Sequence, residues 1–335
     1  MKIKIGDITK IRTGKLDANA ADENGQYPFF TCSKEPLKIN TYSYDCECVL
    51  VAGNGDLNVK YYNGKFDAYQ RTYIIEDDSD GLLFMPYLYF FMESYIDELR
   101  KQSIGGVIKY IKLKNLTDAL IELPSIEVQR KIVNIISKAK EIVRRKENEF
   151  ELLDELVKAR FVEMFGEIED CDKWESKIWN EVVTIKNGRD YKKVLVSDGG
   201  YPVVGTGGEI ARASKYLCPE NTIVVGRKGS INNPMLMKEK FWNVDTAFGV
   251  IPNSDYLHYQ YFYCFCKFYN FMKLNKATTL PSTTKADLLK IRINIPPLEL
   301  QNQFASFVQE IDKSRSRIQK SLEASQELFD SLMQE

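Results

Sequence analysis

Two stretches of the chain decide its fold: Leu123-Pro-Ser-Ile-Glu127-Val-Gln129 and Ile295-Pro-Pro-Leu-Glu299-Leu-Gln301. Each begins with an apolar residue and a proline, carries a glutamate, and ends in a glutamine. Proline suits the start of a helix because its missing N–H would have no partner there. Glutamate suits the first turn because it faces the positive end of the helix dipole. The sequence therefore predicts that a helix begins at each stretch.

After each stretch, apolar residues recur at alternating intervals of three and four residues for about 40 residues. This heptad spacing is typical of a helix that packs along a partner helix. The seam positions are Ile132, Ile136, Val143, Phe150, Leu153 and Val157 in the first helix, and Phe304, Val308, Ile311, Ile318, Leu322 and Phe329 in the second. At 1.5 Å per residue each helix is about 60 Å long, too long to be stable alone. We expect the two helices to pair antiparallel within the chain; the alternative is that each seam binds another copy of the chain.

The remainder of the chain also repeats, at an offset of about 172 to 175 residues. Ile5-x-x-Ile8-x-x-Ile11-x-x-Gly14 corresponds to Trp179-x-x-Val182-x-x-Ile185-x-x-Gly188. Val49-Leu-Val-Ala-Gly-Asn-Gly55 corresponds to Ile223-Val-Val-Gly-Arg-Lys-Gly229, and both indicate a strand that runs into a glycine turn. A duplicated unit fixes the architecture. We expect an α+β protein with an approximate twofold internal repeat: globular units at 1–123 and 169–295, and long helices at 124–168 and 296–335.

Charge is distributed unevenly along this nearly neutral chain, whose formal net charge is −1. Residues 171–295 carry 18 basic and 11 acidic side chains, whereas residues 1–123 carry 15 and 18. A local basic block attracts polyanions, although a basic surface without a partner is the alternative. The longest apolar run, 82–92, is too short to span a bilayer, the N-terminus lacks an export signal, and seven dispersed cysteines suggest reduced thiols. We expect a cytoplasmic protein that binds no membrane.

Catalytic motifs are scarce. His258 is the single histidine of the chain, which argues against histidine-based metal sites and proton relays. The sequence contains no phosphate-binding loop and no dinucleotide fingerprint. We therefore predict a protein with no active site, no metal and no cofactor of its own. Glu175 and Asp190, each two residues from a lysine, leave open a metal-dependent nuclease.

The polar groups that remain are suited to binding DNA. Glycine turns that follow strands can present cations to phosphates and amides to base edges. The candidate DNA-binding residues are Asn54, Gln70, Arg71, Lys109 and Lys112 in the first half, and Arg227, Lys228, Ser230, Asn232, Asn233, Thr279 and Lys285 in the second. Asn232, Asn233 and Gln70 are candidates for adenine, and Arg227 and Arg71 for guanine. For each of them, an ordinary turn is the alternative.

The duplicated order of these motifs resembles the specificity subunit of type I restriction-modification enzymes. The resemblance rests on residues 123–129 and 295–301, on the two opening segments, and on the strand-to-glycine turns at Gly55 and Gly229. It covers nearly the whole chain. It implies two target recognition domains of mixed α/β structure, with helices that bind methyltransferase subunits.

The resemblance further implies a noncatalytic subunit that reads a two-part DNA sequence, one half-site per recognition domain. Its partners would be double-stranded DNA, two methyltransferase subunits and, through the complex, restriction subunits. A related subunit that serves a methylation-only enzyme is the alternative within the same family. Because the first domain is net acidic, we expect the partner subunits to supply much of the phosphate contact.

Overall fold

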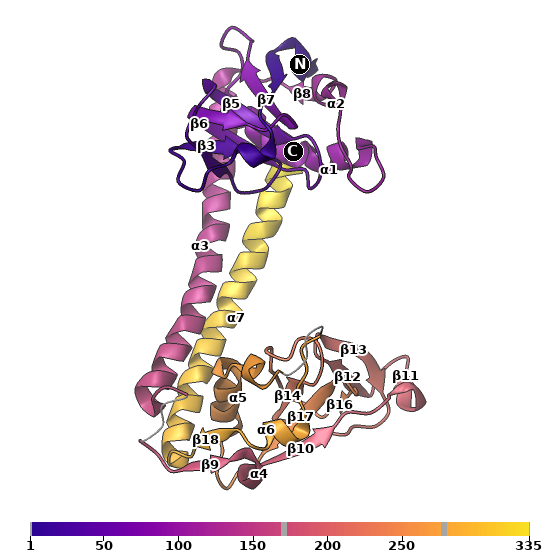
Figure 1. Ribbon diagram of the computed structural model, residues 1–335, viewed down its shortest axis with the longest axis vertical. Helices are drawn as coiled ribbons and strands as arrows, with labels where there is room; N and C mark the ends of the chain where they lie inside the picture. The colour runs from indigo at the N-terminus through magenta and orange to yellow at the C-terminus, as the bar shows by residue number, and fades with distance from the viewer. Residues whose placement is uncertain (1, 169–172, 276–279, 335) are drawn as a thin grey trace. The chain divides into compact units, whose positions relative to one another are not determined.

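The computed structural model describes residues 2–168, 173–275 and 280–334. The chain forms two compact units: Met1–Lys146 with Ser321–Glu335, and Glu147–Lys320 (Figure 1). We call them unit 1 and unit 2. The long helices α3 (Ile126–Phe165) and α7 (Leu298–Gln334) fall inside the two predicted helical ranges, and each contributes to both units. Within the described ranges, no helix combines the length and the apolar character needed to cross a lipid bilayer.

Unit 1 is built on a six-stranded sheet in which all neighbouring strands are antiparallel except β3 and β6. In spatial order the strands are β2 (Thr9–Thr13), β7 (Thr72–Asp77), β5 (Tyr44–Ala52), β6 (Val59–Ala68), β3 (Tyr27–Phe30) and β4 (Leu37–Ile39). The helix α1 (Met85–Gln102) covers this sheet, and its Leu88 and Met92 join the same buried cluster as Val49 and Ile75 of the strands. The smaller elements are η1 (Ile5–Asp7), η2 (Ala18–Ala20) and α2 (Leu113–Thr117).

Unit 2 contains two four-stranded sheets. The first has the order β10 (Val183–Asn187), β17 (Ala247–Pro252), β14 (Thr222–Gly226) and β15 (Met235–Met237). The second has the order β11 (Leu195–Val196), β13 (Gly208–Ala213), β12 (Tyr201–Gly205) and β16 (Trp242–Asn243). The helical elements are α4 (Trp179–Val182), η3 (Lys192–Val194), α5 (Tyr259–Phe268), η4 (Phe271–Leu274) and α6 (Lys285–Leu288).

The internal repeat is confirmed by strand pairing. In unit 1, β1 (Lys2–Lys4) pairs antiparallel with β8 (Leu120–Glu122), the strand that leads into α3. In unit 2, β9 (Ser176–Ile178) pairs antiparallel with β18 (Arg292–Asn294), the strand that leads into α7. The strands β2, β7 and β5 form the same antiparallel ladder as β10, β17 and β14. In each half, the first strand therefore pairs with the strand that directly precedes the long helix.

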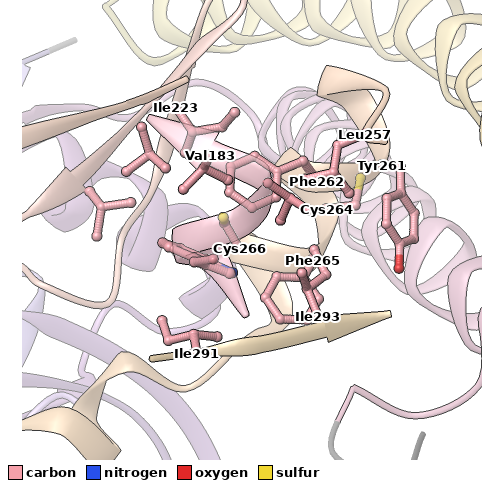
Figure 2. Packing of buried hydrophobic residues seen from close by; sticks show 14 of the residues in the cluster. Val183, Ile223, Leu257, Tyr261, Phe262, Cys264, Phe265, Cys266, Ile291 and Ile293 are labelled. Atoms are coloured by element: carbon pink, nitrogen blue, oxygen red, sulfur yellow. The ribbon is translucent and has the colours of Figure 1, made fainter. Parts of the chain in front are cut away.

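The core of unit 2 lies between its first sheet and α5. Phe262 and Cys266 of α5 belong to the same buried cluster as Val183 and Ile223 of the strands (Figure 2). Cys264 and Cys266 are free thiols inside this core, and burial raises the pKa of Cys264 to about 12. The Cys264-x-Cys266 pair is therefore a packing feature of α5.

The two long helices pack against each other antiparallel, as predicted. In unit 2, the Phe304 ring near the start of α7 lies 5.6 Å from Phe161 and 5.3 Å from Phe165 at the end of α3. Further along, Arg315 of α7 contacts Asp154 of α3. The residues predicted for the seam are all buried or half-buried. The intramolecular antiparallel coiled coil of the predicted fold class is thus present.

In each half, a buried glutamine ties the segment that precedes α1 or α5 to the start of a long helix. The Gln129 amide donates to the carbonyls of Leu82 and Pro124, and its oxygen accepts from the Phe84 N–H, at 2.8 to 2.9 Å. Both Gln129 and Gln301 are fully buried. These contacts hold the residues that directly precede α1 against the first turn of α3.

Gln301 repeats the arrangement in unit 2. Its amide donates to the carbonyls of Tyr256 and Pro296, at 2.9 and 2.8 Å, and its oxygen accepts from the His258 N–H at 2.7 Å. His258 and Phe84 are the residues that directly precede α5 and α1. The glutamine that ends each of the stretches 123–129 and 295–301 is thus a structural residue.

Replacing Gln301 by methionine is expected to destabilise unit 2. The substitution keeps the side-chain volume but leaves buried hydrogen-bonding groups unpaired, at a cost of about 3 kcal/mol in the free energy of unfolding. The three tryptophans, Trp174, Trp179 and Trp242, all lie in unit 2, so their fluorescence during denaturant unfolding reports this unit. The exposed neighbour Asn302→Ala should change the stability by less than about 0.5 kcal/mol. An unchanged midpoint for Gln301→Met would contradict the assigned role.

The contact between Asp154, Lys267 and Arg315 predicts a pH dependence for unit 2. Partial burial opposes ionisation of Asp154, but hydrogen bonds from Lys267 and Arg315 outweigh it, so the pKa of Asp154 lies below its usual value. A depressed pKa stabilises the folded state above the unfolded-state pKa of about 3.9 and ceases to do so as the pH falls through the folded-state value. The wild-type melting temperature should therefore drop on acidification below about pH 4.

The variant Asp154→Asn isolates this contribution. It should melt at a lower temperature than the wild type at pH 6, and the difference should shrink as the pH approaches 3. The exposed neighbour Glu155→Gln serves as the matched control. A difference between wild type and Asp154→Asn that stays constant with pH would reject the ionic contribution.

Candidate nucleic-acid interface

A turn at residues 226–229 follows β14 in unit 2, and its backbone is held by two other segments of the chain. The Arg227 N–H donates to the Thr246 carbonyl at 2.8 Å, and the Gly229 N–H donates to the Pro281 carbonyl at 2.9 Å. These bonds join the turn to the segment before β17 and to the segment before α6. We call this feature the clamped turn of unit 2.

Thr283 completes the clamp from the same side. Its N–H donates to the Arg227 carbonyl at 3.0 Å, and its hydroxyl donates to the Gly226 carbonyl at 2.8 Å. Gly229 has a φ of +82°, a left-handed conformation that glycine adopts without the steric cost of a Cβ atom. The backbone of the turn is thus fixed, while the side chains of Arg227 and Lys228 are exposed.

A cleft of about 560 Å³ opens beside this turn. It is lined by Asn187, Gly188, Arg227, Lys228, Phe248, Ser282, Thr283, Thr284 and Lys285. Three of these residues are cations and five carry hydroxyl groups, an amide or an aromatic ring. The structure therefore gathers Arg227, Lys228 and Lys285 around one polar cleft, although Lys285 lies 58 residues after Arg227 in the sequence.

The cations of the cleft are partly oriented by the protein. The Lys285 ammonium donates to the Ile185 carbonyl at 2.9 Å. The Arg227 guanidinium donates to the Asp245 carbonyl at 3.3 Å and lies 6.0 Å from the centre of the Phe248 ring. Both groups keep donors that can bind an anion or the acceptor edge of a base, because lysine and arginine carry several N–H bonds.

Unit 1 contains the same backbone arrangement after β5. The Gly53 N–H donates to the Arg71 carbonyl at 2.7 Å, the Gly55 N–H donates to the Lys109 carbonyl at 2.9 Å, and the Ile111 N–H donates to the Gly53 carbonyl at 2.9 Å. Gly55 has a φ of +70°. This clamped turn of unit 1 carries Asn54, and it brings together Asn54, Arg71 and Lys109 from the predicted set.

Other predicted residues have structural partners. The Gln70 amide donates to the Asp17 carboxylate at 2.7 Å, and the Asn232 side-chain oxygen accepts from the Phe271 N–H at 2.8 Å. Neither side chain is therefore placed for two simultaneous bonds to an adenine without first changing partners. Lys112, the residue before α2, is exposed.

Ser230 and Asn233 are exposed on the loop that follows the clamped turn of unit 2. Thr279, the last residue of the predicted set, lies outside the described residues. Asn187 was not among the predicted residues; it lines the cleft at the end of β10, directly before the repeat glycine Gly188. A Cβ atom at Gly188 would lie 1.7 Å from the Val244 carbonyl oxygen, so this glycine permits the close approach that forms the cleft wall. Asn187 could have been predicted from the sequence because it directly precedes Gly188, a glycine that recurs in the internal repeat.

The two carboxylates considered for a nuclease have local partners. Glu175 forms an ion pair with Lys177 at 2.6 Å, and the Asp190 carboxylate accepts from the Lys192 N–H at 3.0 Å. Among the described residues, no group of three or more histidine, cysteine or acidic side chains is placed to hold a metal ion.

A family model described as the type I restriction modification DNA specificity domain matches residues 1–152 and 171–326. The chain belongs to this family. The two matched segments correspond to the two halves of the internal repeat, so the specificity domain is present twice. The predicted resemblance to type I specificity subunits is confirmed, and with it the assignment of this chain as a DNA-binding specificity subunit.

Among curated proteins, the chain is similar to the type I restriction enzyme EcoDI specificity subunit of Escherichia coli, with 45% identity over 123 residues. That alignment covers 37% of this chain and 27% of the relative's length. The similarity to the MjaVIII specificity subunit of Methanocaldococcus jannaschii is 22% identity over 372 aligned positions, 92% of this chain and 85% of the relative.

Solved structures show the same fold. The type I restriction-modification S subunit from M. genitalium matches with a TM-score of 0.68 at 16% identity, over 99% of this chain and 94% of that one. A chain from a study of complex assembly and conformational transition of the type I R-M system matches with a TM-score of 0.59 at 15% identity, over 100% of this chain and 96% of that one.

Proposed function

We propose that this specificity subunit reads a two-part sequence in double-stranded DNA, one half-site with each recognition domain. The domains would be residues 1–123 and 169–295, separated by the helical ranges 124–168 and 296–335. The observation that carries the proposal is the clamped turn, which occurs in both halves with the same backbone bonds but different polar side chains, exposed Arg227 and Lys228 in unit 2 and half-buried Asn54 in unit 1. A fixed backbone with variable polar side chains is what sequence-specific readout requires.

In unit 2, Arg227 is the first candidate for a base contact. Its guanidinium can bond two acceptors of guanine at once, and Lys228 and Lys285 beside it can bind phosphates. Asn233 and Asn187 are available for further base edges. In unit 1, Asn54, Arg71 and Lys109 would act in the same way, and Lys112 is a further candidate. Ser230 and Thr279 remain proposed contacts, whereas Gln70 and Asn232 would first have to leave Asp17 and the Phe271 N–H.

We further propose that the subunit is noncatalytic and that two methyltransferase subunits dock on its helices, with restriction subunits joining through the complex. An exposed apolar stripe on α3 supports docking: Val128, Ile135 and Ile142 recur at intervals of seven and are 40%, 51% and 48% exposed. Residues seven apart lie on one face of a helix. The buried seam residues hold the two helices together, so a partner would bind this outer stripe instead.

The proposed base contact predicts a loss of DNA affinity for the double variant Arg227→Ala and Lys228→Ala. The assembled methyltransferase should bind its target about tenfold more weakly or worse, because one base contact and one phosphate contact are lost. The dependence of affinity on salt should also become shallower. The measurement is fluorescence anisotropy with a labelled duplex over a series of salt concentrations.

The matched control is Lys192→Ala with Lys193→Ala, two exposed cations of unit 2 in η3 that do not line the cleft. It should retain wild-type affinity. Equal affinities for the Arg227/Lys228 variant and the wild type would reject the cleft as the reading site.

The division of the target between two domains predicts a specific change in host methylation. Replacing residues 173–292 by the corresponding domain of another member of the family should alter one half of the methylated sequence and leave the other half unchanged. Methylome sequencing of cells that carry the wild-type or the hybrid subunit checks this. A hybrid that changes both halves, or neither, would contradict one half-site per domain.

A further inference from the structure

The segment between α1 and α2 exposes two branched apolar side chains at its tip. Val107 is 104% exposed and Ile108 is 63% exposed. In Figure 1 this segment projects from the side of unit 1. Single exposed apolar residues are common on protein surfaces, whereas Val107 and Ile108 are adjacent and together form a small apolar tip.

The tip is a short, well-defined hairpin. The Ile104 N–H donates to the Tyr110 carbonyl at 3.0 Å, and the Tyr110 N–H donates to the Ile104 carbonyl at 2.9 Å. Two reciprocal backbone bonds of this kind fix the pairing of the two arms. The apolar side chains are therefore presented at a defined position.

The hairpin is joined to the clamped turn of unit 1. Its Lys109 carbonyl accepts the Gly55 N–H, and Tyr110 forms an antiparallel bridge with Asn54. Val107 and Ile108 thus stand next to the residues that we propose for DNA contact. The exposed cations Lys109 and Lys112 follow directly in sequence, and cations of this kind bind the phosphates that flank a groove.

Unit 2 carries an exposed apolar residue at the corresponding place. Leu280 is 54% exposed and precedes Pro281, whose carbonyl accepts the Gly229 N–H. In unit 1, Ile108 precedes Lys109, whose carbonyl accepts the Gly55 N–H. Relative to the two clamped turns, Ile108 and Leu280 are therefore equivalent. The recurrence of an exposed apolar side chain at this place in both halves is a second, independent observation.

We propose that Val107 with Ile108 in unit 1, and Leu280 in unit 2, act as wedges that enter duplex DNA at a base step within or beside each half-site and partly unstack it. This inference rests on the proposed function, because it assigns the apolar tips to the same DNA surface. Apolar side chains flanked by cations are the feature by which proteins unstack and bend duplexes. The bonds that join Lys109 and Pro281 to the two clamped turns place Ile108 and Leu280 beside the proposed DNA contacts, which favours DNA over a partner protein as the occupant.

The test uses the full chain assembled with its methyltransferase subunits, on duplexes that carry the target defined by methylome sequencing. The adenine analogue 2-aminopurine, which fluoresces more strongly when unstacked, is placed at successive positions of one half-site other than the adenine that is methylated, because methyltransferases extrude that base from the duplex. With the wild type, fluorescence should rise at one step of that half-site. Val107→Ser with Ile108→Ser should abolish this rise and weaken binding about tenfold, without changing which adenine is methylated. Leu280→Ser should do the same in the other half-site.

The matched control is Leu120→Ser, because Leu120 is 54% exposed in unit 1 but lies in β8 rather than on the hairpin. It should behave like the wild type. If wild-type complexes bind the target specifically but no position brightens, and the serine variants bind within about twofold of the wild type, the wedge is rejected while the proposed function stands.

Two other outcomes are separable. If the serine variants fail to assemble with methyltransferase subunits in size-exclusion chromatography, while Leu120→Ser assembles, the tip contacts a partner protein and the wedge is rejected. If the wild-type complex shows no preference for the target over unrelated DNA, the proposed function itself fails.

Discussion

The fold depends on the burial of one glutamine side chain in each half. Gln129 and Gln301 each satisfy one N–H and two carbonyls at the junction where α1 or α5 starts and a long helix starts. A helix of about 60 Å cannot be stable in isolation, so it needs contacts along its length and a defined beginning. The glutamine bonds to backbone groups that directly precede both helices, so it holds the two helix starts together. Without the glutamine, these buried N–H and carbonyl groups would lack hydrogen-bond partners, and each would lower the free energy of unfolding.

Further along the helices, an ion pair joins a shorter helix to a long helix within each unit. In unit 1, Glu93 of α1 binds Lys140 of α3 at 2.9 Å. In unit 2, Lys267 of α5, which occupies the position equivalent to Glu93, binds Asp154 of α3 at 2.8 Å. If α1 were placed where α5 lies, Glu93 would face Asp154, and like charges at that distance repel. Lys140 lies on the long helix that follows α1, whereas Asp154 lies on the long helix that precedes α5, so the two ion pairs are separate features of the two units rather than a repeated contact.

The architecture could be predicted from the sequence because its signals are periodic and duplicated. The heptad spacing from Ile132 to Val157 identifies a helix whatever surrounds it, and the repeat offset aligns β1 and β8 with β9 and β18. The interface could be predicted only in part. Gly55 and Gly229 mark the turns, but their bonds to Lys109 and Pro281 connect residues more than fifty positions apart, and no local pattern encodes such pairs. For the same reason the bond from Gln70 to Asp17 was not foreseen.

If the clamped turns read DNA as proposed, the separation of backbone and side-chain roles would let such a subunit change its target without losing its fold. Every bond that clamps the two turns, apart from the Thr283 hydroxyl, runs between backbone atoms. Asn54 and Lys228 occupy equivalent positions, and neither side chain takes part in the clamp. A substitution there alters what the surface can bind while the N–H and carbonyl groups beneath keep their partners, so its effect on stability should be small. The glycines with positive φ are different, because any side chain would strain the turn itself. Under the proposed function, specificity and foldability would therefore be carried by different atoms of the same short segments.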